Sequence, residues 1–218
     1  MANDFVIIAI DGGAGSGKST TARMISQRLN YMHVDTGSHY RLLTHWFLKG
    51  KISPEELLNQ ETLTKLQLDS VLTGTSCRMR INKEDVIDSE LRTEQINEMV
   101  SIYSALSSVR KHLFNYQRSL VKFGQSNKFQ GIIMEGRDIG SVILPDADLK
   151  LFLFASEEIR NQRREAQGLI DSIKKRDRLD SERKNSPLIA TSNSIHIDTG
   201  SISIEEVYLL IIEHIKKL

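Results

Sequence analysis

Residues 5–20 decide the fold of this chain, and they read Phe-Val-Ile-Ile-Ala-Ile-Asp-Gly-Gly-Ala-Gly-Ser-Gly-Lys-Ser-Thr. The segment opens with an apolar, β-branched run of strand length, continues through a glycine-rich turn and then takes on helical periodicity. The phosphate-loop pattern G-x-x-x-x-G-K-[ST] is matched by Gly12, Gly17, Lys18 and Ser19. Because the pattern stands between an expected strand and an expected helix, it favours a phosphate site over an ordinary glycine-rich turn.

The spacing of this motif has a physical cause. Glycines let the backbone curl so that successive N–H groups point inward and bind an anion. The loop opens onto a helix N-terminus, where the helix dipole also favours negative charge. Lys18 can then reach the β- and γ-phosphates of a nucleotide, and the Ser19 hydroxyl can hold Mg²⁺.

Length and composition indicate one α/β domain, with room for a small insertion in 218 residues. The 29 basic and 28 acidic residues give a net charge of +1, which argues against a general nucleic-acid or membrane surface. Cys77 is the single cysteine, so we expect no internal disulfide, no cysteine metal cluster and a reducing, cytoplasmic environment. We expect no signal peptide and no membrane-spanning helix, because no apolar run approaches about 20 residues.

Short apolar runs alternate with helical patterns along the rest of the chain, which predicts a parallel sheet flanked by helices. Further strands are expected at 32–34, 131–134, 149–154 and 194–198, and helices at 20–29, 38–48, 92–101, 109–123 and 170–184. Helix starts are predicted at Ser53-Pro54, at Ser156 and at the capping box Ser203–Glu206. Between 68 and 87 the pattern changes to an antiparallel ribbon that turns at 73–75 and includes Val86-Ile87, which indicates an insertion.

A ligand of such a sheet lies at the carboxyl ends of its strands. Asp11, Asp35, Glu135 and Asp138 are expected just after strands. Glu135 could steer Mg²⁺ through water, Gly136 would permit close backbone approach, and Arg137 could bind phosphate oxygens. The alternative for this segment is a polar loop with a local Arg–Asp ion pair.

Two other clusters carry open alternatives. Thr36 either caps a helix whose Arg41 grips a phosphate, or belongs to an ordinary helix start with a solvated arginine. Of six arginines mixed with acidic residues, we expect two or three to stabilise phosphate charge and the others to be solvated: Arg160, Arg163, Arg164, Arg176, Arg178 and Arg183. The six histidines lack metal-ligand spacing, and structural roles are expected for them, as for Trp46 and Phe47 in the core.

Several of these segments together resemble the bacterial cytidylate kinase family, and the resemblance spans about residues 7–207. The phosphate loop marks only the superfamily. The more specific blocks are Glu135-Gly136-Arg137-Asp138-Ile139-Gly140 and Arg176-Asp177-x-x-Asp180-Ser181-x-Arg183 followed by Pro187-Leu188. Two weaker blocks are Asp35-Thr36-Gly37-x-x-Tyr40-Arg41 and Glu84-Asp85-Val86 leading to Leu91-Arg92-Thr93.

The resemblance implies a P-loop kinase that transfers the γ-phosphoryl group of ATP to CMP or dCMP with Mg²⁺. It implies a three-layer α/β fold with a core at 1–61, 103–155 and 185–218, a small antiparallel nucleoside-monophosphate-binding insertion at about 62–102, and a short lid at about 156–184. We expect a monomer. The chain departs from the family pattern at Glu135, where Asp is usual, at Gly13, where Pro is usual, and in a shorter stretch between Arg164 and Arg176.

Site residues follow from the same resemblance. ATP phosphates would be bound by Gly12, Gly13, Ala14, Gly15, Ser16, Gly17, Lys18, Ser19 and Thr20. The residues expected to act in catalysis are Lys18, Arg41, Arg137, Arg160 and Arg164, with Mg²⁺ on Ser19 and, through water, on Glu135. The residues expected to bind CMP are Thr36, Tyr40, Arg41, Ser101, Arg110, Arg137, Asp138, Arg176, Asp180 and Arg183.

The chemistry of the expected base contact is consistent with this. Cytosine offers an amine donor at N4, which suits the carboxylate of Asp138, whereas uracil places a carbonyl there. Two alternatives remain open: a kinase of another small acceptor such as UMP, and a nucleotide-regulated binding switch without phosphoryl transfer. Activity with each nucleoside monophosphate would separate them.

Overall fold

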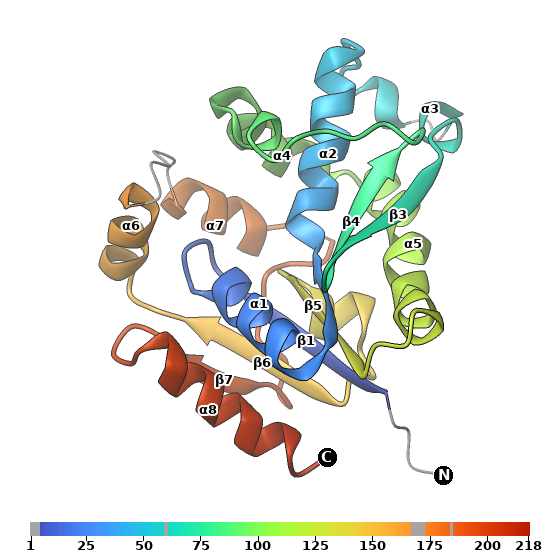
Figure 1. Ribbon diagram of the computed structural model, residues 1–218. Coiled ribbons are helices and arrows are strands. Elements are labelled where there is room, and N and C mark those ends of the chain that lie inside the picture. The colour runs from blue at the N-terminus through green and yellow to red at the C-terminus, as the bar shows by residue number, and fades with distance from the viewer. Residues whose placement is uncertain (1–4, 59–60, 167–172, 184) are drawn as a thin grey trace.

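The computed structural model describes residues 5–58, 61–166, 173–183 and 185–218, and for residues 173–176 the backbone alone. It contains a seven-stranded sheet of order β3-β4-β2-β5-β1-β6-β7 (Figure 1). All neighbouring strands are parallel except β3 and β4. The strands are β1 Val6–Gly12, β2 Tyr31–Asp35, β3 Leu68–Thr73, β4 Ser76–Ile81, β5 Gly131–Gly136, β6 Leu149–Phe154 and β7 Ile195–Asp198.

Helices cover both faces of this sheet, which confirms the predicted α/β class. They are α1 Lys18–Leu29, α2 Thr36–Lys49, α3 Glu61–Thr64, α4 Glu94–Ala105, α5 Ser107–Ser126, α6 Glu157–Glu165, α7 Ile173–Ser181 and α8 Ile204–Ile215. Short 3₁₀ turns occupy Glu56–Leu58 and Glu90–Arg92, and a π-helical turn occupies Ile139–Ile143. Within the described residues, no helix combines the length and apolarity needed to cross a membrane.

The alternation of side chains along β1 divides the core. Ile8 and Ile10 point to the face covered by α1 and α8, where they pack with Ile25 and Ile211. Ala9 points to the opposite face and belongs to the layer that includes Leu120 of α5. Since all six side chains are buried, the central strands are apolar on both faces, as expected of a parallel sheet covered by helices.

A third cluster lies around α2, α4 and α5. Phe47 and Leu113 are fully buried there, and Tyr103 packs against the ring of Phe47. The expectation that Phe47 lies in the core is confirmed. Trp46 is only partly buried and packs on the outside of this cluster.

Several predicted elements agree with the structure closely. The strand predicted at 149–154 has those bounds, and Ser156 caps α6 by accepting a hydrogen bond from the Ile159 amide. The capping box of α8 is present, with the Ser203 hydroxyl accepting from the Glu206 amide and the Glu206 carboxylate accepting from the Ser203 amide.

One local prediction is met only in part and another is wrong. Ser53 and Glu56 form their reciprocal capping contacts, but the helix that follows at Glu56–Leu58 is a 3₁₀ turn instead of an α-helix. Val86-Ile87 is not a strand, because the ribbon ends at Ile81 and continues only through an isolated bridge to Glu84. A capping pattern and an apolar pair are short-range signals, and neighbouring segments decide whether a full element follows.

The ribbon β3–β4 is a continuation of the main sheet. β4 runs parallel to β2, with His33 opposite Ser76 and Val34 opposite Cys77. The division of the chain into core, insertion and lid stays a prediction.

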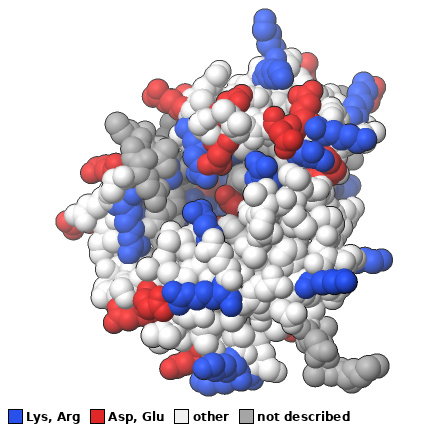
Figure 2. Space-filling view, in the orientation of Figure 1, with Lys and Arg blue, Asp and Glu red and all other residues white. Residues whose placement is uncertain are grey.

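The strand ends converge as predicted. Asp11, Asp35 and Glu135 lie inside the last two residues of β1, β2 and β5, not after them, while Asp138 follows β5. Basic and acidic side chains gather together around a hollow on the face shown in Figure 2.

Candidate active site

The loop between β1 and α1 has the backbone that the phosphate-loop pattern predicts. Gly15 has φ 73° and Gly17 has φ 87°, a left-handed region that suits glycine. The ammonium of Lys18 lies back over this loop and donates to the carbonyl of Gly13 at 2.7 Å. Burial, reinforced by the nearby Arg137 guanidinium, lowers the pKa of Lys18 to about 8. Near pH 8 the Lys18 side chain is therefore only partly protonated, and a bound anion would raise its pKa and restore the positive charge.

The Ser19 hydroxyl and Glu135 lie together at the start of α1. The hydroxyl donates to Glu135 Oε2 at 2.7 Å, and the other carboxylate oxygen, Oε1, lies 2.8 Å from His33 Nε2. A hydroxyl beside a carboxylate is the set of hard oxygen ligands that Mg²⁺ prefers, so the residues present fit this ion. The structure brings together Ser19 and Glu135, the two residues expected at Mg²⁺. His33 was expected to be structural, and no local pattern marks it.

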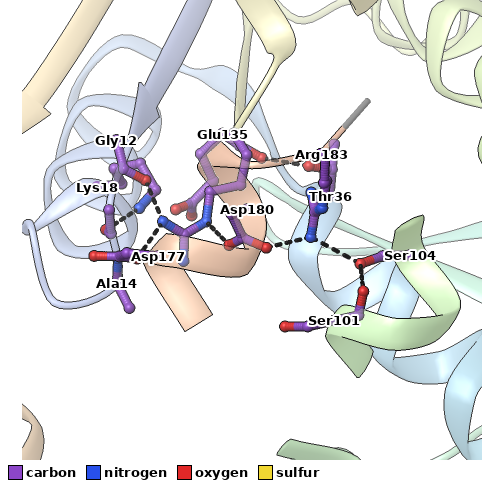
Figure 3. A network of polar contacts seen from close by, with 12 residues as sticks. Gly12, Ala14, Lys18, Thr36, Ser101, Ser104, Glu135, Asp177, Asp180 and Arg183 are labelled. Atoms are coloured by element: carbon purple, nitrogen blue, oxygen red, sulfur yellow. Dashed lines mark hydrogen bonds and ion pairs between the residues drawn. The ribbon is translucent and has the colours of Figure 1, made fainter. Parts of the chain in front are cut away.

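Asp177, on α7, lies directly over the phosphate loop (Figure 3). Its Oδ1 accepts hydrogen bonds from the Ala14 amide at 3.1 Å and from Arg137 at 3.0 Å, and its other oxygen pairs with Arg160. Burial alone would raise the pKa of Asp177, but the two arginines and the Ala14 amide lower it below its usual range. The Asp177 carboxylate thus binds the hydrogen-bond donors that would suit phosphate oxygens.

The two arginines that meet Asp177 also hold the loop itself. Arg137 donates to the Gly12 carbonyl and Arg160 to the Ala14 carbonyl, each at 3.0 Å. Both arginines had been expected to face the phosphates, and both do lie at the loop. Asp177 had no predicted role, although it stands in the block 176–183 that carries the resemblance.

Asp180, one turn further along α7, connects Arg137 to Arg183. Its carboxylate lies 3.1 Å from Arg137 Nε and pairs with Arg183, which also donates to the Ser104 hydroxyl at 2.9 Å. Figure 3 shows this chain of contacts running from the phosphate loop to α4. The carboxylate is 5% exposed, so these pairs are shielded from solvent and fix the positions of both guanidinium groups.

A second ion pair lies deeper in the hollow. Asp138 pairs with Arg110 of α5, and both side chains are buried. Arg110 also donates to the Ser104 carbonyl at 3.1 Å and lies 5.3 Å from the centre of the Tyr40 ring. Burial raises the pKa of Tyr40 to about 12, so its hydroxyl stays protonated. The pairing is between distant elements, so the alternative of a purely local Arg137–Asp138 pair is wrong.

The segment that carries Asp138 is anchored by Asp11. The two carboxylate oxygens accept from the amides of Ile139 at 2.8 Å and Gly140 at 2.7 Å. Gly136 provides the close approach that was expected, because a Cβ there would come within 2.5 Å of the Thr36 hydroxyl. Backbone contacts therefore place residues 137 and 138 against the end of β1.

Thr36 is not the helix cap that one interpretation expected. Asp35 caps α2, since its carboxylate accepts from the Ser38 amide at 3.3 Å, whereas the Thr36 hydroxyl donates to the Glu135 carbonyl at 2.8 Å. Arg41 is buried and donates to the Leu91 carbonyl at 2.9 Å and to the Asn97 side chain at 2.8 Å. The interpretation with a solvated arginine is therefore wrong.

Arg163, one of the six arginines, had no individual role assigned, and it joins the loop to the segment before α8. It donates to the Thr199 hydroxyl at 3.0 Å and to the Thr199 carbonyl at 2.6 Å. Arg164 is buried beside it. The side chain of Arg176 lies outside the described residues.

Two hollows meet at the phosphate loop. One has a volume of about 170 Å³ and is lined by most of the residues predicted to bind CMP. The other, of about 810 Å³, lies between α1, α6 and the segment at 199–204. The residues that line both are Gly15, Lys18, Ser19, Arg92 and Arg164. Arg92 had no predicted role, although it lies in the block leading to Thr93. A site with two compartments joined at a lysine and a serine can bring two phosphorylated ligands end to end.

Comparison with known proteins gives the same family as the sequence blocks. The family model described as cytidylate kinase matches residues 8–217. The cytidylate kinase of Geobacillus sp. (strain WCH70) is 40% identical, over 94% of each chain, and that of Bacillus subtilis (strain 168) is 37% identical, over 96% of each.

Solved structures share the fold at lower identity. An uncharacterised protein from Eubacterium ventriosum has a TM-score of 0.55 at 18% identity, with 98% of this chain and 99% of that chain covered. A Thermus thermophilus protein has a TM-score of 0.52 at 17% identity, with 96% of each covered.

Proposed function

The chain belongs to the cytidylate kinase family, and we propose that the two hollows are where this nucleoside monophosphate kinase brings ATP and CMP or dCMP together for transfer of the γ-phosphoryl group. The observation that carries the assignment of sites is that both hollows share Lys18 and Ser19. In the proposal, the larger hollow takes ATP and the smaller one takes the nucleoside monophosphate.

The acceptor nucleotide is assigned to the smaller hollow because of its lining. Asp138 would accept a hydrogen bond from the N4 amine of cytosine, while Arg110 holds that carboxylate in place. Arg41 and Arg137 supply positive charge for the phosphate, with Tyr40 beside them. Asp180, whose two oxygens are paired with Arg137 and Arg183, would position these arginines and contact the ribose.

Catalysis in this proposal depends on positioning and charge neutralisation. Lys18, Arg137, Arg160 and Arg164 would surround the transferring group, on which negative charge is spread over three oxygens. No side chain needs to form a covalent intermediate, because the two nucleotides react directly. Mg²⁺ would be held by ATP phosphates, by Ser19 and through water by Glu135, and it would neutralise charge on the β- and γ-phosphates.

An assay that couples ADP release to each nucleoside monophosphate tests the proposed acceptor. We expect turnover with CMP and dCMP and much slower turnover with UMP, since uracil would direct a carbonyl at Asp138. Equal turnover of UMP would contradict the base assignment, and no ADP release with any acceptor would favour a binding switch. A monomer in the cytoplasm is also proposed, on composition alone, and sedimentation of the purified chain tests its oligomeric state.

A further inference from the structure

The Glu135 carboxylate is held from two sides inside the protein. Its Oε2 accepts from the Ser19 hydroxyl at 2.7 Å, and its Oε1 lies 2.8 Å from His33 Nε2. The side chains of His33 and Glu135 are only 7% and 3% exposed. A carboxylate oxygen serves as an acceptor, so a hydrogen bond between these two side chains requires the His33 ring to donate from Nε2.

Strand pairing places His33 close to Glu135, and the contacts that hold this strand use the backbone of His33 and not its side chain. β2 and β5 are neighbouring parallel strands in which Asp35 lies opposite Glu135, and His33 stands two residues earlier on the same face. The His33 amide donates to the Thr75 carbonyl at 2.8 Å. A substitution at position 33 would therefore keep the strand in place and remove only the imidazole.

The imidazole lies outside both hollows that would hold the nucleotides. It lines a third hollow of about 550 Å³ next to the β3–β4 turn, which shares Asp35 and Arg92 with the smaller nucleotide hollow. Its ring contacts the nucleotide site through the Glu135 carboxylate. A glutamate side chain has three rotatable bonds, and without a partner for Oε1 it could turn its carboxylate away from Ser19.

We propose that His33 is a positioning residue that holds the Glu135 carboxylate against the Ser19 hydroxyl, so that the pair is ready for the divalent cation bound to ATP. The inference depends on the proposed role of Glu135 at that cation. Partners of this kind, behind the groups that contact a metal, fix the orientation of those groups and raise metal affinity.

The test measures how much Mg²⁺ strengthens ATP binding in the absence of CMP. Titration calorimetry gives the ATP dissociation constant with Mg²⁺ and with EDTA, and the ratio of the two is the metal enhancement. We expect His33→Leu to reduce this ratio by about tenfold, in the range usual for such partners. The EDTA value stays unchanged, because His33 touches neither hollow.

Conservative variants distinguish positioning from folding. Glutamine can place an amide donor near the position of Nε2, so His33→Gln restores the enhancement to within about twofold, while the shorter His33→Asn does not. His214→Leu, on α8, is the matched control and leaves the ratio unchanged. A second readout is the long-range ¹H–¹⁵N spectrum of the histidine rings, in which His33 carries its proton on Nε2.

The outcomes separate this inference from the proposed function. If Glu135→Gln keeps the full enhancement, the metal role of Glu135 is wrong. If Glu135→Gln loses the enhancement while His33→Leu keeps it, the positioning role of His33 is overturned. A ring that carries its proton on Nδ1 alone would also overturn it, since Nε2 could not then donate.

Discussion

The carboxylate of Asp177 accepts a hydrogen bond from the backbone amide of Ala14 at 3.1 Å, inside the phosphate loop. The same carboxylate pairs with Arg137 and Arg160. A phosphate that used these three donors would have to displace the carboxylate, because two anions do not share them. In the proposed site, Asp177 and the phosphates of the nucleotides would therefore compete for one set of donors.

Asp177→Asn removes the competing charge, and we expect it to tighten the binding of ATP. The gain in affinity should be about three- to tenfold, the size of a partly shielded ion-pair interaction. Titration calorimetry without CMP measures it. Glu182→Gln is the control, since Glu182 pairs with Arg178 on the exposed side of α7. Unchanged or weaker ATP binding in the asparagine variant would mean that Asp177 does not compete.

We expect Lys18 to make ATP binding depend on pH. Its pKa is lowered to about 8 by burial, so the free protein loses this charge as the pH rises above 8. Bound phosphates raise the pKa again, and ATP binding then takes up a proton between about pH 8 and pH 10. Calorimetry in two buffers of different ionisation enthalpy reports this uptake. Lys18→Arg keeps its charge over this range, so proton uptake that persists in that variant would assign it to another group.

Asp11 makes the free energy of unfolding depend on pH in the opposite sense to a salt-bridged carboxylate. Burial raises its pKa in the folded state to about 6, above the ordinary value of 3.8. The folded state therefore binds more protons between these values, and its contribution to stability falls as pH rises from about 4 to about 6. The expected loss is on the order of 2–3 kcal/mol.

Urea unfolding at pH 4.5 and pH 7 isolates this contribution when the wild type is compared with Asp11→Asn. The variant loses an acceptor for one of the two amides at both pH values, which shifts its stability by a constant amount. The pH dependence itself should be smaller in the variant. Parallel pH profiles for the two proteins would show that Asp11 is ionised throughout.

Asp138→Asn tests the base contact without leaving Arg110 with an apolar neighbour. An amide can present either a donor or an acceptor, so the variant should accept uracil as well as cytosine. We expect the ratio of kcat/KM for CMP to that for UMP to fall by at least about tenfold, while KM for ATP changes little. A preserved ratio would place recognition of the base elsewhere in the hollow.

The local signals in the sequence determined the elements and the phosphate loop. These signals act over a few neighbouring residues, so their spacing is visible in the chain. They are the glycines with positive φ, the Ser156 cap, the Ser203 capping box and the apolar runs of strand length. The family was visible for the same reason, because its blocks are contiguous. The helix start at 53–56, which opens only a 3₁₀ turn, and the wrong strand at 86–87 occur where a weak local signal has no support from neighbouring segments.

The tertiary structure decided which charges meet. Asp177 reaches Ala14 across 163 residues, His33 reaches Glu135 across 102, and β4 joins the sheet through β2. None of these contacts leaves a spacing in the sequence, because each depends on how helices and strands pack before their side chains come together. Burial then gives the contacts their strength: charges shielded from solvent attract strongly and tolerate few partners, so only the folded chain determines how its arginines and carboxylates are paired.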